Sequence, residues 1–278
     1  MDKEIEIKTL HLFPLLNNML INLLKSLTDE EWAAQTIAKL WKVKDVAAHL
    51  LDTNLRTLSI SRDGYIGERT ENINSYQELV AFLNNLNMTW TNACKRLSPD
   101  VLIFLLESTG QQLSQHLNAL DPFEDAVFPV AWAGQKTSVN WFNTAREYTE
   151  KFLHQQQIRD AVGKQGIMTR ELYYPFLDTF MYAFPHTFKD IKADDRTVVS
   201  LIVTTEIGGQ WNIVKDKDMW ILNKDTNLEA AATVKIAPDI SWKLFSKSWT
   251  PKQVIDEVEM TGNEQLGQHA LQMVSVMA

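Results

Sequence analysis

Apolar residues recur every three to four positions along the first 165 residues, and this period predicts amphipathic helices. The stretch LHLFPLLNNMLINLLKSL, residues 10–27, is the first of them, and Thr28 with Glu31 forms a capping box for the turn that follows it. The same period, together with capping residues, predicts further long helices over residues 43–64, 75–97, 99–120 and 141–162. Four or five long helices joined by modest loops indicate a helix bundle.

The pattern changes after about residue 164. The stretch 171–184 is still helix-like, but residues 196–223 alternate, are rich in β-branched residues and carry Gly-Gly and Lys-Asp turns, as strands do. Another strand is predicted over 228–237, and helices return over 238–248, 250–262 and 263–278. Strands framed by helices indicate a small α+β domain. We therefore predict two domains, a helix bundle over 1–165 and an α+β domain over 166–278.

The composition is typical of a globular protein, and its net charge is negative. Hydrophobic residues make up 45% of the 278 residues, which is enough for a packed core, and no apolar run approaches the ~20 residues of a membrane span. A net charge of -8 argues against a nucleic-acid partner. Cys94 is the only cysteine, so no internal disulfide forms, and we expect a small buried hydrophobe rather than a nucleophile. The start MDKEIEIKTL lacks the features of a signal peptide, so a cytoplasmic location is expected.

Two of the histidines have surroundings typical of ligands. A lone histidine on a helix usually makes one hydrogen bond at the edge of a core, and we interpret four in this way: His11, His116, His186 and His269. His49 lies at the edge of the apolar arc of the helix 43–64, whereas Glu150 and His154 lie one turn apart on the helix 141–162. If the two helices are neighbours, the three residues converge. The same Glu-His spacing is also common on ordinary helix surfaces. Whether Glu150 and His154 are metal ligands or surface residues therefore depends on whether a third ligand, such as His49, lies beside them.

Two imidazole nitrogens and one carboxylate oxygen suit zinc, and nickel or iron also accept this set. Three protein ligands leave an open position, which is the pattern of catalytic rather than structural sites. Asp45, Asp52 and Glu147 lie on the same helices, and we expect them to orient the imidazoles. Trp132 and Trp141 flank the loop before the second ligand helix and are candidates to line the pocket.

Three stretches together resemble the mycothiol-dependent maleylpyruvate isomerase family, which has a DinB-like metal-binding domain. They are LTDEEW at 27–32, WKVKDVAAHLLDT at 41–53 and EYTEKFLHQQQIRDAVG at 147–163. The resemblance covers about residues 8–165 and implies a DinB-like four-helix bundle whose metal, usually zinc, is held by His49, Glu150 and His154. The remainder, about 168–278, is similar to sterol-carrier-type α+β domains, although no short motif there carries the likeness.

The resemblance implies an enzyme that uses a low-molecular-weight thiol, such as mycothiol or bacillithiol, as a cosubstrate. Coordination to a metal favours the thiolate, and a thiolate attacks electrophilic carbon, so the expected reaction is S-transfer to, or isomerisation of, a small electrophilic substrate. No arginine follows Arg196, which weighs against a dicarboxylate such as maleylpyruvate. Two alternatives remain open: a non-catalytic metal-containing protein that binds an apolar ligand through residues 166–278, and a metal-dependent hydrolase with Glu147 as base.

Overall fold

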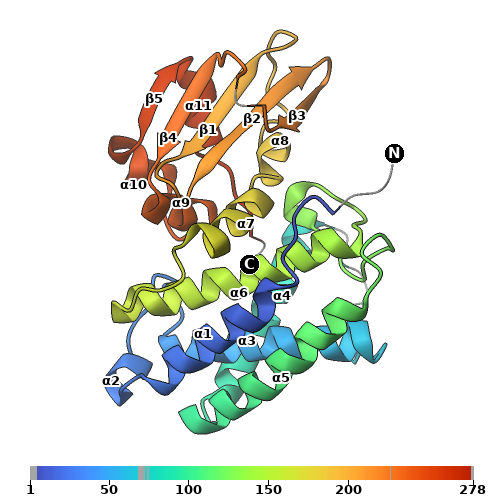
Figure 1. The fold of residues 1–278 in the computed structure, drawn as a ribbon, viewed down its shortest axis with the longest axis vertical. Helices are drawn as coiled ribbons and strands as arrows, with labels where there is room; N and C mark the ends of the chain where they lie inside the picture. Colours follow the sequence, from blue (N-terminus) through green and yellow to red (C-terminus); the bar gives the residue numbers. More distant parts are fainter. Residues whose placement is uncertain (1–4, 68–72, 74, 226, 277–278) are drawn as a thin grey trace. The chain divides into compact units, whose positions relative to one another are not determined.

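The computed structural model describes residues 5–67, 73, 75–225 and 227–276, and the contacts among them form two compact units (Figure 1). The first unit contains the described residues up to Phe128 and the segment Val139–Ile167, and the second contains Pro129–Ser138 and Met168–Val276. The segment Pro129–Ser138, which contains Trp132 and precedes the last bundle helix in sequence, is thus part of the second unit.

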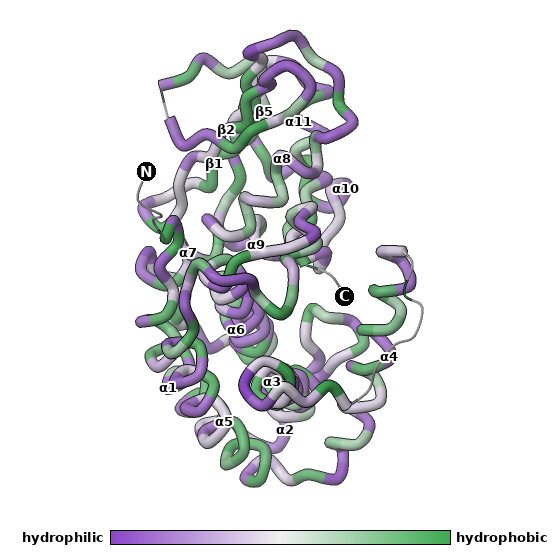
Figure 2. Tube along the Cα trace, turned by 90° about the vertical axis from the view of Figure 1, so that its right-hand side faces the viewer, coloured by the Kyte–Doolittle hydropathy of each residue, from purple (hydrophilic) through white to green (hydrophobic). Residues whose placement is uncertain are grey.

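The first unit is a helix bundle, as the apolar period predicts. Its elements in chain order are α1 (Leu12–Lys25), α2 (Asp29–Trp32), α3 (Val43–Thr57), a π-helical turn (Leu58–Arg62), α4 (Tyr76–Cys94), α5 (Pro99–Ala119) and α6 (Asn140–Val162). α3 packs against α4, α5 and α6, and α1 packs against α5 and α6. Hydrophobic and hydrophilic stretches alternate along α1 and α5, because each turns one face to the core (Figure 2). No helix in the described part of the chain is long and apolar enough to cross a membrane.

Capping residues fix several helix ends where the sequence predicts them. The Thr28 hydroxyl accepts a hydrogen bond from the Glu31 amide, and the Glu31 carboxylate accepts one from the Thr28 amide, which completes the capping box. Pro99 begins α5, and Gly163 ends α6 with a φ of 66° that suits glycine. The helix predicted over 43–64 differs, because α3 ends at Thr57 and the backbone continues as the π-helical turn.

α6 differs from an ordinary surface helix because many of its buried side chains are polar. Glu147, His154, Gln155, Gln157 and Arg159 are each less than one tenth exposed. Buried polar groups cost free energy unless they are hydrogen-bonded or paired. This helix therefore needs polar partners on its neighbours, and α3 supplies several of them.

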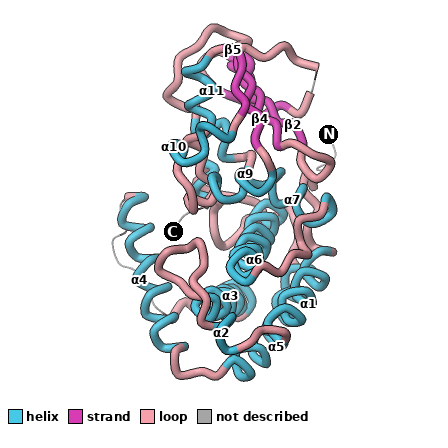
Figure 3. Tube along the Cα trace, turned by 90° about the vertical axis from the view of Figure 1, so that its left-hand side faces the viewer, coloured by secondary structure: helices cyan, strands magenta, loops and turns pink. Residues whose placement is uncertain are grey.

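The second unit is α+β, as predicted, and it holds the strands β1–β5, which are gathered in one sheet (Figure 3). Its helices are α7 (Arg170–Phe180), α8 (Ala183–Thr187), α9 (Pro238–Phe245), α10 (Pro251–Val254) and α11 (Glu264–Ala270). The strands are β1 (Val198–Val203), β2 (Gly209–Asp216), β3 (Met219–Asn223), β4 (Ala232–Ile236) and β5 (Glu259–Gly262), in the spatial order β3-β2-β1-β4-β5. β1 and β4 are parallel, and the other neighbours are antiparallel.

The last part of the second unit corrects one prediction. The stretch 250–262 is predicted as a helix, but α10 covers only its first turn, and Glu259–Gly262 forms the edge strand β5. β5 pairs with β4, and the Lys235 ammonium lies 2.7 Å from the Glu259 carboxylate across that pair. Pairing along the sheet edge therefore outweighs the helical tendency of this short segment.

Candidate metal centre

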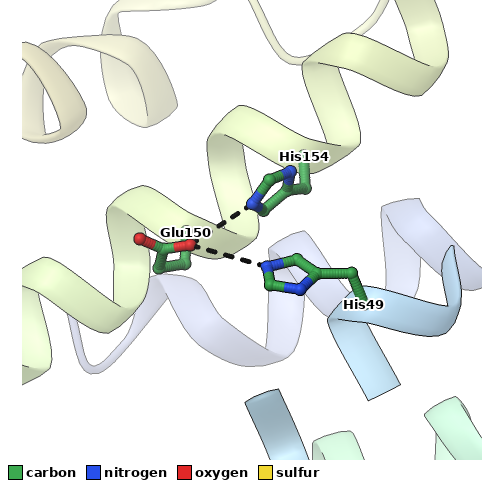
Figure 4. Close-up of side chains that lie close together, drawn as sticks. All are labelled: His49, Glu150 and His154. Atoms are coloured by element: carbon green, nitrogen blue, oxygen red, sulfur yellow. Dashed lines mark ion pairs between the residues drawn. The ribbon is translucent and has the colours of Figure 1, made fainter. Parts of the chain in front are cut away.

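Two neighbouring helices bring the predicted ligand residues together. His49 comes from the second turn of α3, and Glu150 and His154 come from successive turns in the middle of α6 (Figure 4). The Asp45 carboxylate accepts a hydrogen bond from the Lys42 amide at 3.0 Å, which fixes the start of α3. Because α3 packs against α6, His49 faces the other two residues.

The three side chains point toward one another (Figure 4). Glu150 Oε2 lies 3.3 Å from His154 Nε2 and 4.0 Å from His49 Nε2. The two imidazole ring centres are 4.5 Å apart, with 73° between the ring planes. One ligand atom from each residue lies within 4.8 Å of the other two, and both histidines are buried while Glu150 is partly exposed. Two nitrogens and one oxygen at this spacing can bind a single divalent cation.

Burial and charge set the protonation of the cluster. Burial and the neighbouring charge of His154 lower the pKa of His49 to about 4, although Glu150 acts in the opposite direction. Burial raises the pKa of the Glu150 carboxyl, but the neighbouring His154 and His49 outweigh burial, so this pKa lies well below its usual range. A neutral imidazole and an ionised carboxylate are the forms that bind a metal.

The side chains around the imidazoles include two that the sequence analysis does not identify. His154 Nδ1 lies 2.9 Å from Oε1 of the buried Gln157, and this contact favours the ring proton on Nδ1 and directs the Nε2 lone pair toward Glu150. The Trp41 ring centre lies 4.7 Å from that of His49 and 5.9 Å from that of His154, so the indole covers one side of both imidazoles. His49 Nδ1 is buried and has no hydrogen-bond partner among the described residues.

The acids predicted to orient the imidazoles have other partners. Asp45 caps the start of α3, Asp52 pairs with Arg56 at 2.9 Å, and Glu147 pairs with Arg146 at 2.5 Å. Within the described part of the chain, none of the three acids hydrogen-bonds an imidazole, so this prediction is wrong. The sequence signal for the observed partner is its position three residues after His154, which places Gln157 on the same face of α6.

The other candidate residues lie outside the cluster. Cys94 is 3% exposed near the end of α4, where burial raises the pKa of its thiol, as expected of a core residue. Trp141 and Thr144 line a cavity of about 470 Å³ in the first unit, and none of the three ligand residues borders it. Trp132 packs edge-on against Phe180 in the second unit, with 6.1 Å between ring centres.

Positive charges flank the cluster from both helices. Arg146 on α6 contributes to the low pKa of Glu150, and Arg56 on α3 contributes to the low pKa of His49. Burial lowers the pKa of Lys151, which follows Glu150 on α6, to about 8. Positive charge near the cluster therefore comes from the bundle helices, and the lack of arginine after Arg196 does not by itself argue against a dicarboxylate substrate.

A cluster of two histidines and one glutamate inside a helix bundle, followed in sequence by an α+β unit, defines a protein with a candidate metal centre between bundle helices. The family model of the mycothiol maleylpyruvate isomerase N-terminal domain matches residues 15–159. The chain belongs to this family, as its motifs predict.

Two solved structures are similar to nearly the whole chain. A crystal structure of a mutant of the mycothiol-dependent maleylpyruvate isomerase has 12% sequence identity and a TM-score of 0.56, and the match covers 94% of this chain and 94% of that chain. A crystal structure of the mycothiol-dependent maleylpyruvate isomerase has 13% identity and a TM-score of 0.53, and the match covers 89% of this chain and 91% of that chain. At these identities the likeness establishes the fold alone. No curated protein matches the chain.

A third similarity concerns only part of the chain. The solution structure of the sterol carrier protein domain 2 of Helicoverpa armigera has 14% identity, and the match covers 36% of this chain and 89% of that chain. Its TM-score of 0.27 is too low to establish a shared fold.

Proposed function

We propose that the chain is an enzyme that holds a divalent metal at His49, Glu150 and His154 and uses a low-molecular-weight thiol as cosubstrate. The convergence of three ligand atoms within 4.8 Å from two helices carries this proposal. The thiol is supported by the family, whose solved members are described as mycothiol-dependent. Zinc is the first candidate for the metal, and nickel or iron suit the same set. We further propose that residues 1–165 and 166–278 are separate domains, with the ligands in the first.

The residues fit a cation for an electrostatic reason. In the neutral His154 ring, with the Nδ1 proton donated to Gln157, the Nε2 lone pair faces the Glu150 carboxylate at 3.3 Å. A lone pair and a carboxylate repel each other at this distance unless a proton or a cation lies between them. A divalent cation would remove this repulsion and would neutralise a carboxylate in a largely buried position.

The chemistry follows from the residues around the site. A bound divalent metal would lower the pKa of a coordinating thiol and so supply a thiolate near neutral pH. Gln157 would keep the His154 ring oriented, and Trp41 would exclude water from one side of the imidazoles. With the thiol proton released to solvent, the sulfur electron pair forms a C–S bond to the β-carbon of an activated alkene, and the C=C π pair moves to the conjugated carbonyl as an enolate. After rotation about the former double bond, the enolate pair re-forms C=C and expels the thiolate, which takes a proton from solvent and leaves an isomer. Protonation of the enolate, or loss of chloride where the electrophile is an alkyl chloride, gives an S-conjugate instead.

The hydrolase alternative requires a base next to the metal, and Glu147 is poorly suited to that role. Its Oε1 atom lies 2.5 Å from a nitrogen of Arg146 and accepts a hydrogen bond from Thr57 at 3.3 Å. Oε1 is thus occupied by two donors, and at 2% exposure the carboxylate has little access to a water at the metal. The remaining alternative is a non-catalytic protein that binds an apolar ligand through residues 166–278. It predicts that such a ligand binds without thiol and without metal.

An assay of thiol dependence tests the proposal. Zinc-loaded protein is mixed with mycothiol or bacillithiol and with maleylpyruvate or monochlorobimane, and both isomerisation and thiol consumption are followed. We expect turnover that requires the thiol, is lost in Glu150→Ala and persists in Glu147→Gln. Turnover without thiol that is abolished by Glu147→Gln would favour the hydrolase instead. Metal-loaded protein that turns over none of these pairs would contradict the proposal for these thiols and electrophiles.

A further inference from the structure

Lys151, the residue after Glu150, reaches across from α6 to α3. Its ammonium donates hydrogen bonds to three acceptors on that helix: the Leu50 carbonyl oxygen at 3.4 Å, Thr53 Oγ1 at 2.5 Å and Asn54 Oδ1 at 2.6 Å. An ammonium has three N–H donors, so this set matches its capacity. The contact is therefore directional, unlike the apolar packing around it.

The contact extends to a third helix. Asn54 Nδ2 donates to Thr109 Oγ1 at 2.9 Å, and the Thr109 hydroxyl donates to the Leu105 carbonyl oxygen of α5 at 2.7 Å. Thr53, Asn54 and Thr109 are each less than one tenth exposed. Buried hydrogen bonds of this kind fix one arrangement of the helices, because sliding would leave polar groups unpaired.

The position of this contact matters for the candidate metal centre. Leu50 follows His49 on α3, and Lys151 follows Glu150 on α6. Glu150 and His154 share one helix, so their spacing is set by the helix itself. The distance from His49 to this pair depends instead on how α3 lies along α6. Metal sites tolerate deviations of only about 0.2 Å in ligand distances, so a shift between the two helices would disrupt the set.

We propose that Lys151 is a positioning residue that holds α3 in register with α6 and thereby places His49 opposite Glu150 and His154. The inference rests on the proposed metal site and deepens it. Lys151 is not itself a ligand, because its ammonium is occupied by the three acceptors on α3.

The test compares zinc affinity and the visible absorption spectrum of bound Co²⁺ in the wild-type chain, in Lys151→Met and in a matched control, Arg159→Met. Arg159 is another cation on α6 and is 8% exposed, but its guanidinium donates to the carbonyl oxygens of Met19, Lys164 and Gln165, so it ties α6 to α1 and to the following loop. We expect Lys151→Met to lower zinc affinity by about tenfold or more and to shift the Co²⁺ spectrum, which reports ligand geometry. Arg159→Met should change neither.

A second variant keeps the test decisive if Lys151→Met does not fold. Asn54→Leu removes one acceptor of the ammonium and the link to Thr109, so it should also weaken zinc binding and shift the Co²⁺ spectrum. If the two residues act through one contact, the losses of affinity in the single variants will not add in the double variant. Thermal stability is not the readout, because removal of a buried charge can raise or lower it.

Two results would overturn the inference in distinguishable ways. Wild-type zinc affinity and an unchanged Co²⁺ spectrum in folded Lys151→Met, or in Asn54→Leu if the first variant does not fold, would refute the positioning role and leave the metal site intact. A wild-type chain that binds neither zinc nor Co²⁺ would contradict the proposed function, and the positioning role would fail with it.

Discussion

Replacement of Gln157 by alanine should weaken zinc binding without touching a ligand. Gln157 is 4% exposed, and its Oε1 atom lies 2.9 Å from Nδ1 of His154, so the variant leaves the imidazole with nothing to fix its tautomer and orientation. Loss of such a partner typically lowers metal affinity by about 10- to 100-fold. Since a tenfold change corresponds to about 1.4 kcal/mol, the expected loss of binding free energy is about 1.4–2.8 kcal/mol.

Competition with a chromogenic chelator at fixed pH measures this loss directly. Gln156→Ala is the matched control, because Gln156 is the preceding glutamine and is also buried, at 9% exposed, but its side chain points about 100° away around the helix. We expect the control to bind zinc like the wild type. Equal affinities for wild type and Gln157→Ala, within about twofold, would refute the role assigned to this contact.

Three further predictions concern Trp41, Cys94 and Asp178. Addition of Co²⁺ or Ni²⁺ should quench the fluorescence of Trp41, whose ring centre lies 4.7 Å from that of His49, and the quenching should be much smaller in Trp41→Phe. Cys94 is 3% exposed and burial raises its pKa, which leaves less thiolate, so a thiol reagent should modify it far more slowly than free cysteine at neutral pH until denaturant is added. Asp178→Ala should lower the free energy of unfolding in urea by about 1–3 kcal/mol, because Asp178 accepts a hydrogen bond from the buried Trp211 indole at 2.8 Å. Asp178→Asn, which keeps an acceptor, should lose less stability.

Features that depend on neighbours in sequence were predictable. Thr28, Pro99 and Gly163 mark helix ends through local hydrogen bonds or backbone angles, so the sequence places those ends well. Glu150 and His154 share a helix face because of their spacing, whereas the approach of His49 depends on packing between helices and was supported by the motif around it.

Features that depend on packing between helices, or on which of several neighbours a side chain pairs with, are harder to predict from the sequence. The sequence analysis places Asp52 beside an imidazole, yet Asp52 pairs with Arg56 four residues later on its own helix, and that i,i+4 pair is also readable from the sequence. The roles of Gln157 and Lys151 depend on side-chain rotamers and on the distance between helices, which no pattern of apolar residues encodes. Strand β5 forms because β4 offers an edge 24 residues away in sequence, as the pairing of Lys235 with Glu259 illustrates.

The metal content of the purified protein tests the central claim most directly. The protein is prepared without a histidine tag and incubated with zinc, excess metal is removed, and bound metal is measured by elemental analysis. His154→Ala removes a proposed ligand, and His116→Ala, a histidine on α5 that contacts Ser61 at 2.8 Å, is the control. We predict close to one metal ion per chain in the wild type and in His116→Ala, and little or none in His154→Ala. A wild-type chain without metal after incubation, or a His154→Ala variant that retains it, would contradict the assignment of His49, Glu150 and His154 as a metal centre.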